Sequence, residues 1–239
     1  MGTSSDYAGG SGGAWTPLKR AATSYAKYGG RERATRLLAR HVAALGGAAG
    51  AASAARAGML AGQRLGGLLA GVATEGLTPT LERLGFAELV GRDRFEILDA
   101  LITHLAGPGS DLEAQAARDA ACDILEELFP EGTAYEDLAS VTVDAEDLER
   151  LLALFLAAYV YNRVPIIAER LTRLSDPQAA ERMDKELRDY IRAYVDLKLG
   201  DDPLAIDWAG AEGRGIVERA IQALYALLEA EEEDAGAGR

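Results

Sequence analysis

From residue 16 onward, one pattern recurs along the chain: apolar residues at helical spacing, preceded by capping residues or Pro and followed by Gly or Pro. Thr16-Pro17 and Asp176-Pro177 are typical helix starts, because Pro is tolerated in the first turn. No stretch alternates polar and apolar residues long enough for a strand, since the nearest, residues 140–144, is too short. The sequence therefore predicts an all-α fold, an irregular multi-helix bundle.

The expected helices follow from these signals. They cover residues 16–28, 31–45, 78–85, 94–105, 110–129, a short turn after 133, then 144–174, 176–199 and 213–231. One apolar face is expected to hold Phe95, Leu98, Ile102 and Leu105. Ser110 with Glu113, and Thr133 with Glu136, have capping-box spacing. Pro165 should kink the long helix that contains it, because its ring clashes with the preceding turn.

The two ends of the chain differ in composition from the rest. Residues 1–15 are rich in Gly and Ser and predict a flexible, disordered tail, because they cannot bury enough surface to offset their ordering entropy. Residues 16–232 are expected to form the helical domain, with a basic Gly/Ala-rich part at 16–75 and an acidic part at 76–232. Residues 233–239 are expected to fray.

Small residues recur at every fourth position between residues 46 and 70. The row consists of Gly46, Gly50, Ala54, Gly58, Gly62, Gly66 and Ala70. Such a row predicts close helix packing inside a bundle, and it leaves open an oligomerising or membrane-inserting segment. Arg56, Gln63 and Arg64 interrupt the row and argue against a permanent membrane span.

Charge is distributed unevenly along the chain. The whole sequence has 25 Lys or Arg and 38 Asp or Glu, a formal net charge of −13, which argues against direct binding to nucleic acid. Residues 1–74 hold nine basic and two acidic residues, a net +7, so residues 75–239 carry −20. Arg31, Arg33, Arg36 and Arg40 are therefore expected to attract acidic surfaces, within the chain, in a homo-oligomer or on a partner.

No catalytic or metal-binding pattern is present in the sequence. His41 and His104 are isolated, and Cys122 lies close to an apolar helix face, where an inert thiol is expected. Asn162 and Arg163, just before Pro165, are the polar candidates inside the long helix. We expect no enzymatic activity, no metal and no cofactor. Without a signal-peptide pattern or an uncharged run of about 18 apolar residues, a cytoplasmic location is expected.

The first residues carry the one specific resemblance. Met1-Gly2-Thr3-Ser4-Ser5, followed by the glycine-rich residues 9–13, resembles the start of QatB, the small helical component of the Qat anti-phage defence system. The resemblance implies an ATPase and a QueC-like enzyme as partners. It also implies that this enzyme joins a deazaguanine base to Gly2 after Met1 is removed, with Thr3, Ser4 and Ser5 as recognition residues.

Elementary chemistry is compatible with that role for the N-terminus. A terminal glycine has no side chain to obstruct an active site. The pKa of its α-amine is about 8, so a fraction of these amines is unprotonated at neutral pH. Asp6 stands where N-myristoylation needs Ser or Thr. Two other functions remain open at this point: a membrane-active effector that uses the small-residue row, and a plain helical adaptor.

Overall fold

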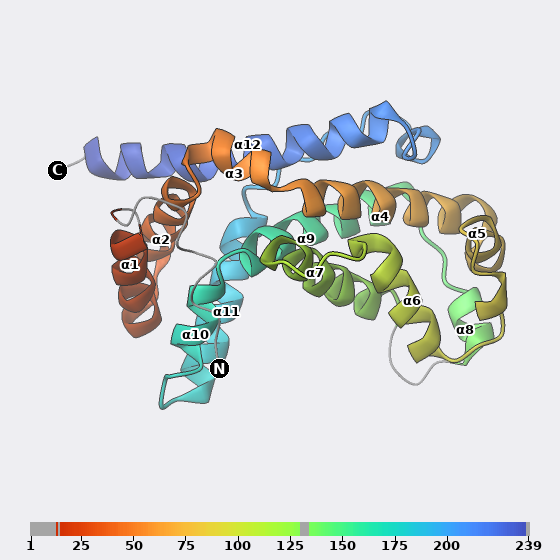
Figure 1. The fold of residues 1–239 in the computed structure, drawn as a ribbon, viewed down its shortest axis with the longest axis horizontal. Coiled ribbons are helices and arrows are strands. Elements are labelled where there is room, and N and C mark those ends of the chain that lie inside the picture. The colour runs from red at the N-terminus through yellow and green to blue at the C-terminus, as the bar shows by residue number, and fades with distance from the viewer. Residues whose placement is uncertain (1–12, 14, 130–133, 238–239) are drawn as a thin grey trace. The chain divides into compact units, whose positions relative to one another are not determined.

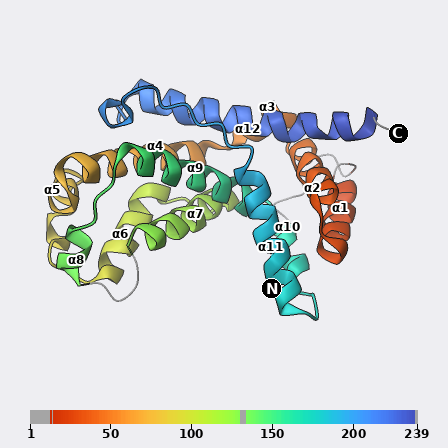
Figure 2. The ribbon, with the colours of Figure 1, turned by 180° about the vertical axis from the view of Figure 1, so that it is seen from behind.

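The computed structural model describes residue 13, residues 15–129 and residues 134–237, with side chains through residue 231. These residues form twelve α-helices and two short 3-10 helices, without a strand in the described part (Figures 1 and 2). The predicted all-α, multi-helix fold is confirmed. Of the predicted N-terminal tail, only Gly13 and Trp15 belong to the described residues.

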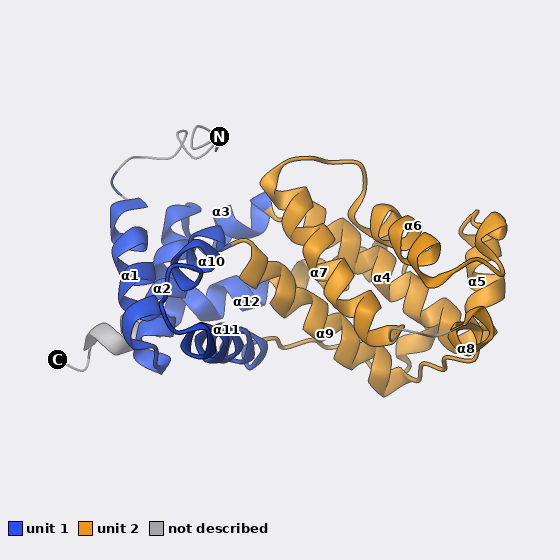
Figure 3. Ribbon diagram, turned by 90° about the horizontal axis from the view of Figure 1, so that it is seen from below, with its two compact units in different colours: residues 1–54, 164–194, 222–239 blue, residues 55–163, 195–221 orange. Residues whose placement is uncertain are grey.

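The chain divides into two compact units. Unit 1 comprises residues 1–54, 164–194 and 222–239, and unit 2 comprises residues 55–163 and 195–221 (Figure 3). Each unit is thus built from segments distant in sequence. The unit boundaries fall after residues 54, 163, 194 and 221, and only the last of these lies inside a helix, Ala211–Ala237.

Unit 1 is a group of short helices around a small core. It contains α1 (Trp15–Tyr28), α2 (Arg31–Ala44), α3 (Gly47–Ala54), α10 (Pro165–Leu171), α11 (Pro177–Arg192) and the later part of α12 (Ala211–Ala237). Helix α1 packs against α2 and α10, while α2 also contacts α3 and α11. The buried side chains of unit 1 include Leu18, Tyr25, Leu37, Leu38, Val42, Ile167 and Leu187. The apolar stripes of α1 and α2 therefore face the interior of this unit.

Unit 2 is organised around one central helix. It contains α4 (Arg56–Glu75), α5 (Leu77–Arg83), η1 (Ala87–Leu89), α6 (Arg94–Ala106), α7 (Leu112–Leu128), α8 (Tyr135–Ala139), α9 (Ala145–Asn162), η2 (Pro203–Ala205) and the start of α12. Helix α4 contacts α5, α6, α7 and α9, and α7 also packs against α6 and α9. Because α4 has neighbours on several sides, it needs small residues where large side chains approach it.

Several predicted helix boundaries are wrong by a few residues or more. The helix expected over 144–174 ends at Asn162, and Pro165 instead begins the separate helix α10, where its missing N–H is no loss. Helix α11 ends at Arg192, not near residue 199. Helix α12 continues to Ala237, beyond the expected end at 231 and into the segment expected to fray.

Aspartate side chains cap α6, α7 and α9, and the capping box predicted at Ser110 is wrong. Asp93 and Asp144 cap α6 and α9, since their side chains accept hydrogen bonds from the backbone N–H groups three residues later, at 3.0 and 2.8 Å. Asp111, not Ser110, caps α7. Thr133 lies outside the described residues, and at α8 the Asp137 side chain accepts from the N–H of Ala134.

The predicted apolar face of α6 is also wrong in part. Phe95 is 77% exposed and Ile102 is half-buried, whereas Leu98 and Leu105 are buried as expected. Ile97 and Leu101 complete the buried face. The face is rotated because packing against α4 and α7, which periodicity alone does not specify, selects the buried side.

None of the described helices alone is both long and apolar enough to cross a bilayer, and only α9 and α10 taken together reach that composition.

Candidate functional site

The residues expected at the modification site precede the described structure. Gly2, Thr3, Ser4 and Ser5 all lie outside the described residues. The first described helix, α1, begins at Trp15, one residue before the predicted Thr16 start. The structure therefore describes the surroundings of the functional site from α1 onward, because α1 is the helix that directly follows the tail.

Three glycines of the small-residue row lie buried on α4. A Cβ atom added at Gly58 would overlap the ring of Tyr159, and one added at Gly66 would overlap the ring of Trp208. At Gly62 it would lie 3.0 Å from Val217 Cγ1. These glycines thus make room for large side chains of unit 2, instead of for another backbone.

The earlier members of the row have a different role. Gly46 is exposed and has a φ of +92°, a left-handed conformation at the turn between α2 and α3 that favours glycine. Gly50 belongs to the separate helix α3, where an added Cβ would overlap the carbonyl oxygen of Leu45. The row does not run along one continuous helix, because α3 ends at Ala54 and α4 begins at Arg56.

A basic strip runs along the exposed side of α1 in unit 1. It consists of Lys19, Arg20 and Lys27 from α1, Arg36 and Arg40 from α2, and Arg170 from α10. Lys19, Arg20 and Lys27 are exposed because Leu18, Ala21, Ala22, Tyr25 and Ala26 occupy the buried face of the same helix. Helical periodicity therefore places the cations of α1 outward, beside those of α2.

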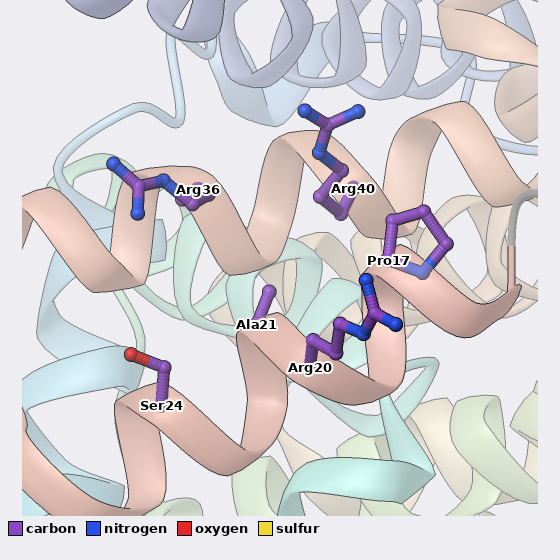
Figure 4. Close-up of a pocket in the computed structure, with 6 residues that line it drawn as sticks. All are labelled: Pro17, Arg20, Ala21, Ser24, Arg36 and Arg40. Carbon is purple, nitrogen blue, oxygen red and sulfur yellow. The ribbon is translucent and has the colours of Figure 1, made fainter.

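Two shallow cavities lie along this strip. One, of about 350 Å³, is lined by Pro17, Arg20, Ala21 and Ser24 of α1 and by Arg36 and Arg40 of the neighbouring helix α2 (Figure 4). The other, of about 490 Å³, is lined by Thr16, Lys19, Arg20, Thr23, Ser24, Lys27, Tyr28 and Arg170. Arg20 and Ser24 border both cavities, so the two are adjoining. The described residues that line them supply cations and hydroxyl groups and no carboxylate.

Hydrogen bonds between distant segments fix α1 and α2 within unit 1. The Tyr25 hydroxyl donates to the carbonyl oxygen of Met183 at 2.7 Å. Burial, together with the nearby carboxylates of Glu186 and Asp184, raises the pKa of Tyr25 well above its usual 10.0. Thr35 on α2 shares a hydrogen bond of 2.6 Å with the Tyr190 hydroxyl on α11.

Tyr194 extends this set of contacts beyond the end of α11. Its hydroxyl accepts a hydrogen bond from Arg31 at 3.3 Å and shares another with Tyr190 at 3.1 Å. Desolvation and the bond to Tyr190 raise the pKa of Tyr194 to about 12, although Arg31 acts in the opposite direction. The strip is therefore carried by helices whose positions within unit 1 are set by specific polar contacts.

Unit 2 contains a buried charged cluster. The Arg163 guanidinium, whose side chain is only 3% exposed, donates to Glu113 through Nε at 2.6 Å. The Tyr159 hydroxyl donates to the other oxygen of the same carboxylate. The cluster joins the start of α7 to the end of α9. Asn162, the other predicted candidate, has a buried Nδ2 without a hydrogen-bond partner among the described residues.

His104 and Cys122 each lie among residues of their own surroundings. His104 stacks edge-on with Phe86, and burial, with a contribution from Arg64, lowers the pKa of His104. Burial and the surrounding carboxylates, Glu126 first, raise the pKa of the half-buried Cys122. Within the described residues, no three His, Cys, Asp or Glu side chains gather in a way that could hold a metal ion.

The geometry thus defines an all-helical protein of two compact units, of which unit 1 presents a basic strip built from α1, α2 and α10. Comparison with family models matches residues 46–228 to QatB, described as the Qat anti-phage system associated protein. Because the match covers more than half of the chain, the chain belongs to the QatB family and is a component of the Qat anti-phage system. Neither a comparison with curated proteins nor one with solved structures found a match.

Parts of the candidate site were missed in the sequence. The cations of α2 were expected to form a basic surface, but Lys19, Arg20 and Lys27 were not assigned to it, although their helical spacing was a signal. Arg170 gives no such signal, because 143 residues separate it in sequence from Lys27. The matched residues 46–228 begin after α2, so the N-terminal resemblance and the strip cations of α1 and α2 lie outside the matched segment, whereas Arg170 lies within it.

Proposed function

We propose that this protein is a non-enzymatic component of its Qat system, in which the N-terminal glycine accepts a deazaguanine group from a QueC-like enzyme. The family membership supports a role inside the system. The resemblance of Met1–Ser5 to the family's N-terminus is the observation that carries the proposal. In this function the helical body presents the tail and binds the other components, among them the ATPase.

The chemistry requires little from the protein beyond an accessible amine. Gly2 becomes terminal when Met1 is removed, and about one tenth of an α-amine with a pKa near 8 is unprotonated at pH 7. Attack of that amine on an activated acyl group forms an amide bond, expels the activating group and releases one proton. The 13 residues from Gly2 to Ala14 can span at most about 45 Å, so the amine can reach an active site well away from α1.

The fold favours this function over a membrane-active one. Gly58, Gly62 and Gly66 are covered by Tyr159, Phe155, Val217 and Trp208 of the same unit. A segment whose small-residue face is already filled by its own side chains offers no such face to a bilayer or a second copy.

Intact-mass spectrometry tests the proposal. The protein is purified alone and after co-expression with the QueC-like enzyme, in wild-type form and as Gly2→Pro. The wild type should lose only Met1 when alone and should gain the mass of the deazaguanine group when co-expressed. Gly2→Pro should lose Met1 and gain nothing, because its terminal secondary amine is sterically hindered. Gly13→Ala serves as the control, since an added Cβ at this exposed position meets nothing within 4 Å. An unmodified wild type beside an active partner enzyme would contradict the proposal.

A further inference from the structure

The basic strip is unusual within a chain that has an excess of acidic residues. Unit 1 contains 14 Lys or Arg and 13 Asp or Glu, yet the six cations of the strip line two adjoining cavities without a carboxylate among the described lining residues. Cations held side by side on helix faces repel one another, and this repulsion is relieved when an anionic surface binds. The charge pattern therefore indicates an acidic occupant.

The contacts of the individual cations agree with this interpretation. Lys19 and Arg20 have no ion pair within the described residues, whereas Arg36 pairs with Glu32 at 3.0 Å. Arg170 carries a buried Nε that lacks a hydrogen-bond partner in the described part of the chain. Several donors of the strip thus retain capacity to bind carboxylates.

The lining of the cavities favours a protein surface over a nucleic acid. Pro17 and Ala21 add apolar surface to the lining of one cavity, which suits side chains of a partner. Tyr28 is the exposed aromatic ring beside the strip, and Lys27 and Arg33 already lie over it, at 5.0 and 5.1 Å from its centroid. Both ring contacts are therefore with cations of the chain itself, and the net charge of −13 repels a long phosphate backbone.

The position of the strip points to a particular task. Helix α1 is the first described helix after the tail that carries Gly2. A partner bound to α1 would hold its active site within reach of the tail and would raise the effective concentration of the terminal amine there. Docking at a site distinct from the reacting atom improves substrate capture without changing the chemical step.

We propose that the basic strip is the docking surface for the modifying enzyme, which binds it through an acidic surface of its own. This inference rests on the proposed function, and it names the part of the folded body that the enzyme recognises. The strip acts in positioning: it captures the substrate protein, while Gly2 undergoes the reaction.

The test compares two variants with the same change in charge. The strip variant is Lys19→Glu/Arg20→Glu/Lys27→Glu, and the control is Arg182→Glu/Lys185→Glu/Lys198→Glu, whose side chains are 69, 74 and 83% exposed. Both should melt like the wild type, because exposed charges contribute little to stability. Affinity for the purified QueC-like enzyme is measured by calorimetry at about 50 mM and about 300 mM salt. The KM and kcat of modification are measured on the same full-length proteins.

The expected results separate docking from chemistry. The strip variant should lose about tenfold or more in affinity and raise KM by a similar factor, with kcat within about twofold of the wild type. Wild-type affinity should fall as salt is raised. The control variant should match the wild type in affinity, KM and kcat.

Each contrary outcome has a distinct meaning. Equal KM and affinity for the strip variant and the wild type would overturn the docking surface while leaving modification of Gly2 intact. Strip-dependent binding without any mass gain would support the docking surface and overturn the proposed modification. A DNA duplex of about 20 base pairs is titrated in parallel with the same proteins. If the wild type binds this DNA and the strip variant does not, while both bind the enzyme equally well, the inference would be overturned in favour of nucleic acid.

Discussion

Gly66 and Gly67 show how closely individual residues of α4 are specified. An added Cβ at Gly66 would overlap the Trp208 ring, whereas one at Gly67 would lie 3.5 Å from Trp208 Cβ, an ordinary contact. Trp208 is itself fixed, since its carbonyl oxygen accepts from Gln63 Nε2 at 2.8 Å and its indole N–H donates to the carbonyl oxygen of Pro203 at 3.3 Å. The ring therefore has little freedom to move aside.

We expect different effects on stability from alanine substitution at the neighbouring positions 66 and 67. Gly66→Ala should lower the free energy of unfolding by about 1–3 kcal/mol, because it overpacks the contact with Trp208. Gly67→Ala should be neutral or raise it by up to about 1 kcal/mol, because Ala has the higher helix propensity. Urea denaturation of both variants measures the difference. Equal stabilities would show that Trp208 does not pack closely on α4.

At the scale of single elements, the helix start predicted at residue 144 is confirmed, because the Asp144 cap is a local interaction within one turn. The break before Pro165 was expected only as a kink, since local rules show that the proline disturbs a helix but not whether the chain resumes it. The bond from Tyr25 to Met183 joins residues 158 positions apart and has no local signal. The helices of the strip were thus predictable, while the neighbours that complete it, such as Arg170, were not.

The Tyr25 contact between α1 and α11 gives a prediction about pH. Because the pKa of Tyr25 is raised in the folded state, its stabilising contribution is complete below the unfolded pKa near 10 and is lost as pH rises above it. Tyr194, with its pKa raised to about 12, contributes to the same decline between about pH 10 and 12.

Tyr25→Phe isolates the contribution of this hydroxyl. At pH 7 the variant should lose about 1 kcal/mol of stability, because the hydrogen bond to Met183 is removed. Above pH 10 the variant should lose stability less steeply than the wild type. Urea unfolding at pH 7, 9 and 10.5 would reveal this, and parallel declines for the two proteins would contradict the assignment.

On the scale of the whole molecule, two independent signals identify the family. The short N-terminal stretch gave the resemblance, whereas the family match lies in residues 46–228, where no single motif stands out. The divided roles proposed for tail, strip and helical body follow from this arrangement. In the proposal the body provides the folded scaffold, the strip supplies charge for docking, and the tail supplies one reactive amine.

The central claim is that the terminal glycine, presented by the folded body, is required for defence. Its most direct test is phage plaque formation on cells that carry the complete Qat system with wild-type protein, Gly2→Pro or the control Gly13→Ala. Gly2→Pro should lose protection while its melting temperature and abundance stay at the wild-type level, and Gly13→Ala should protect fully. Full protection by Gly2→Pro would contradict the account and would leave the helical body as an adaptor whose N-terminus plays no part.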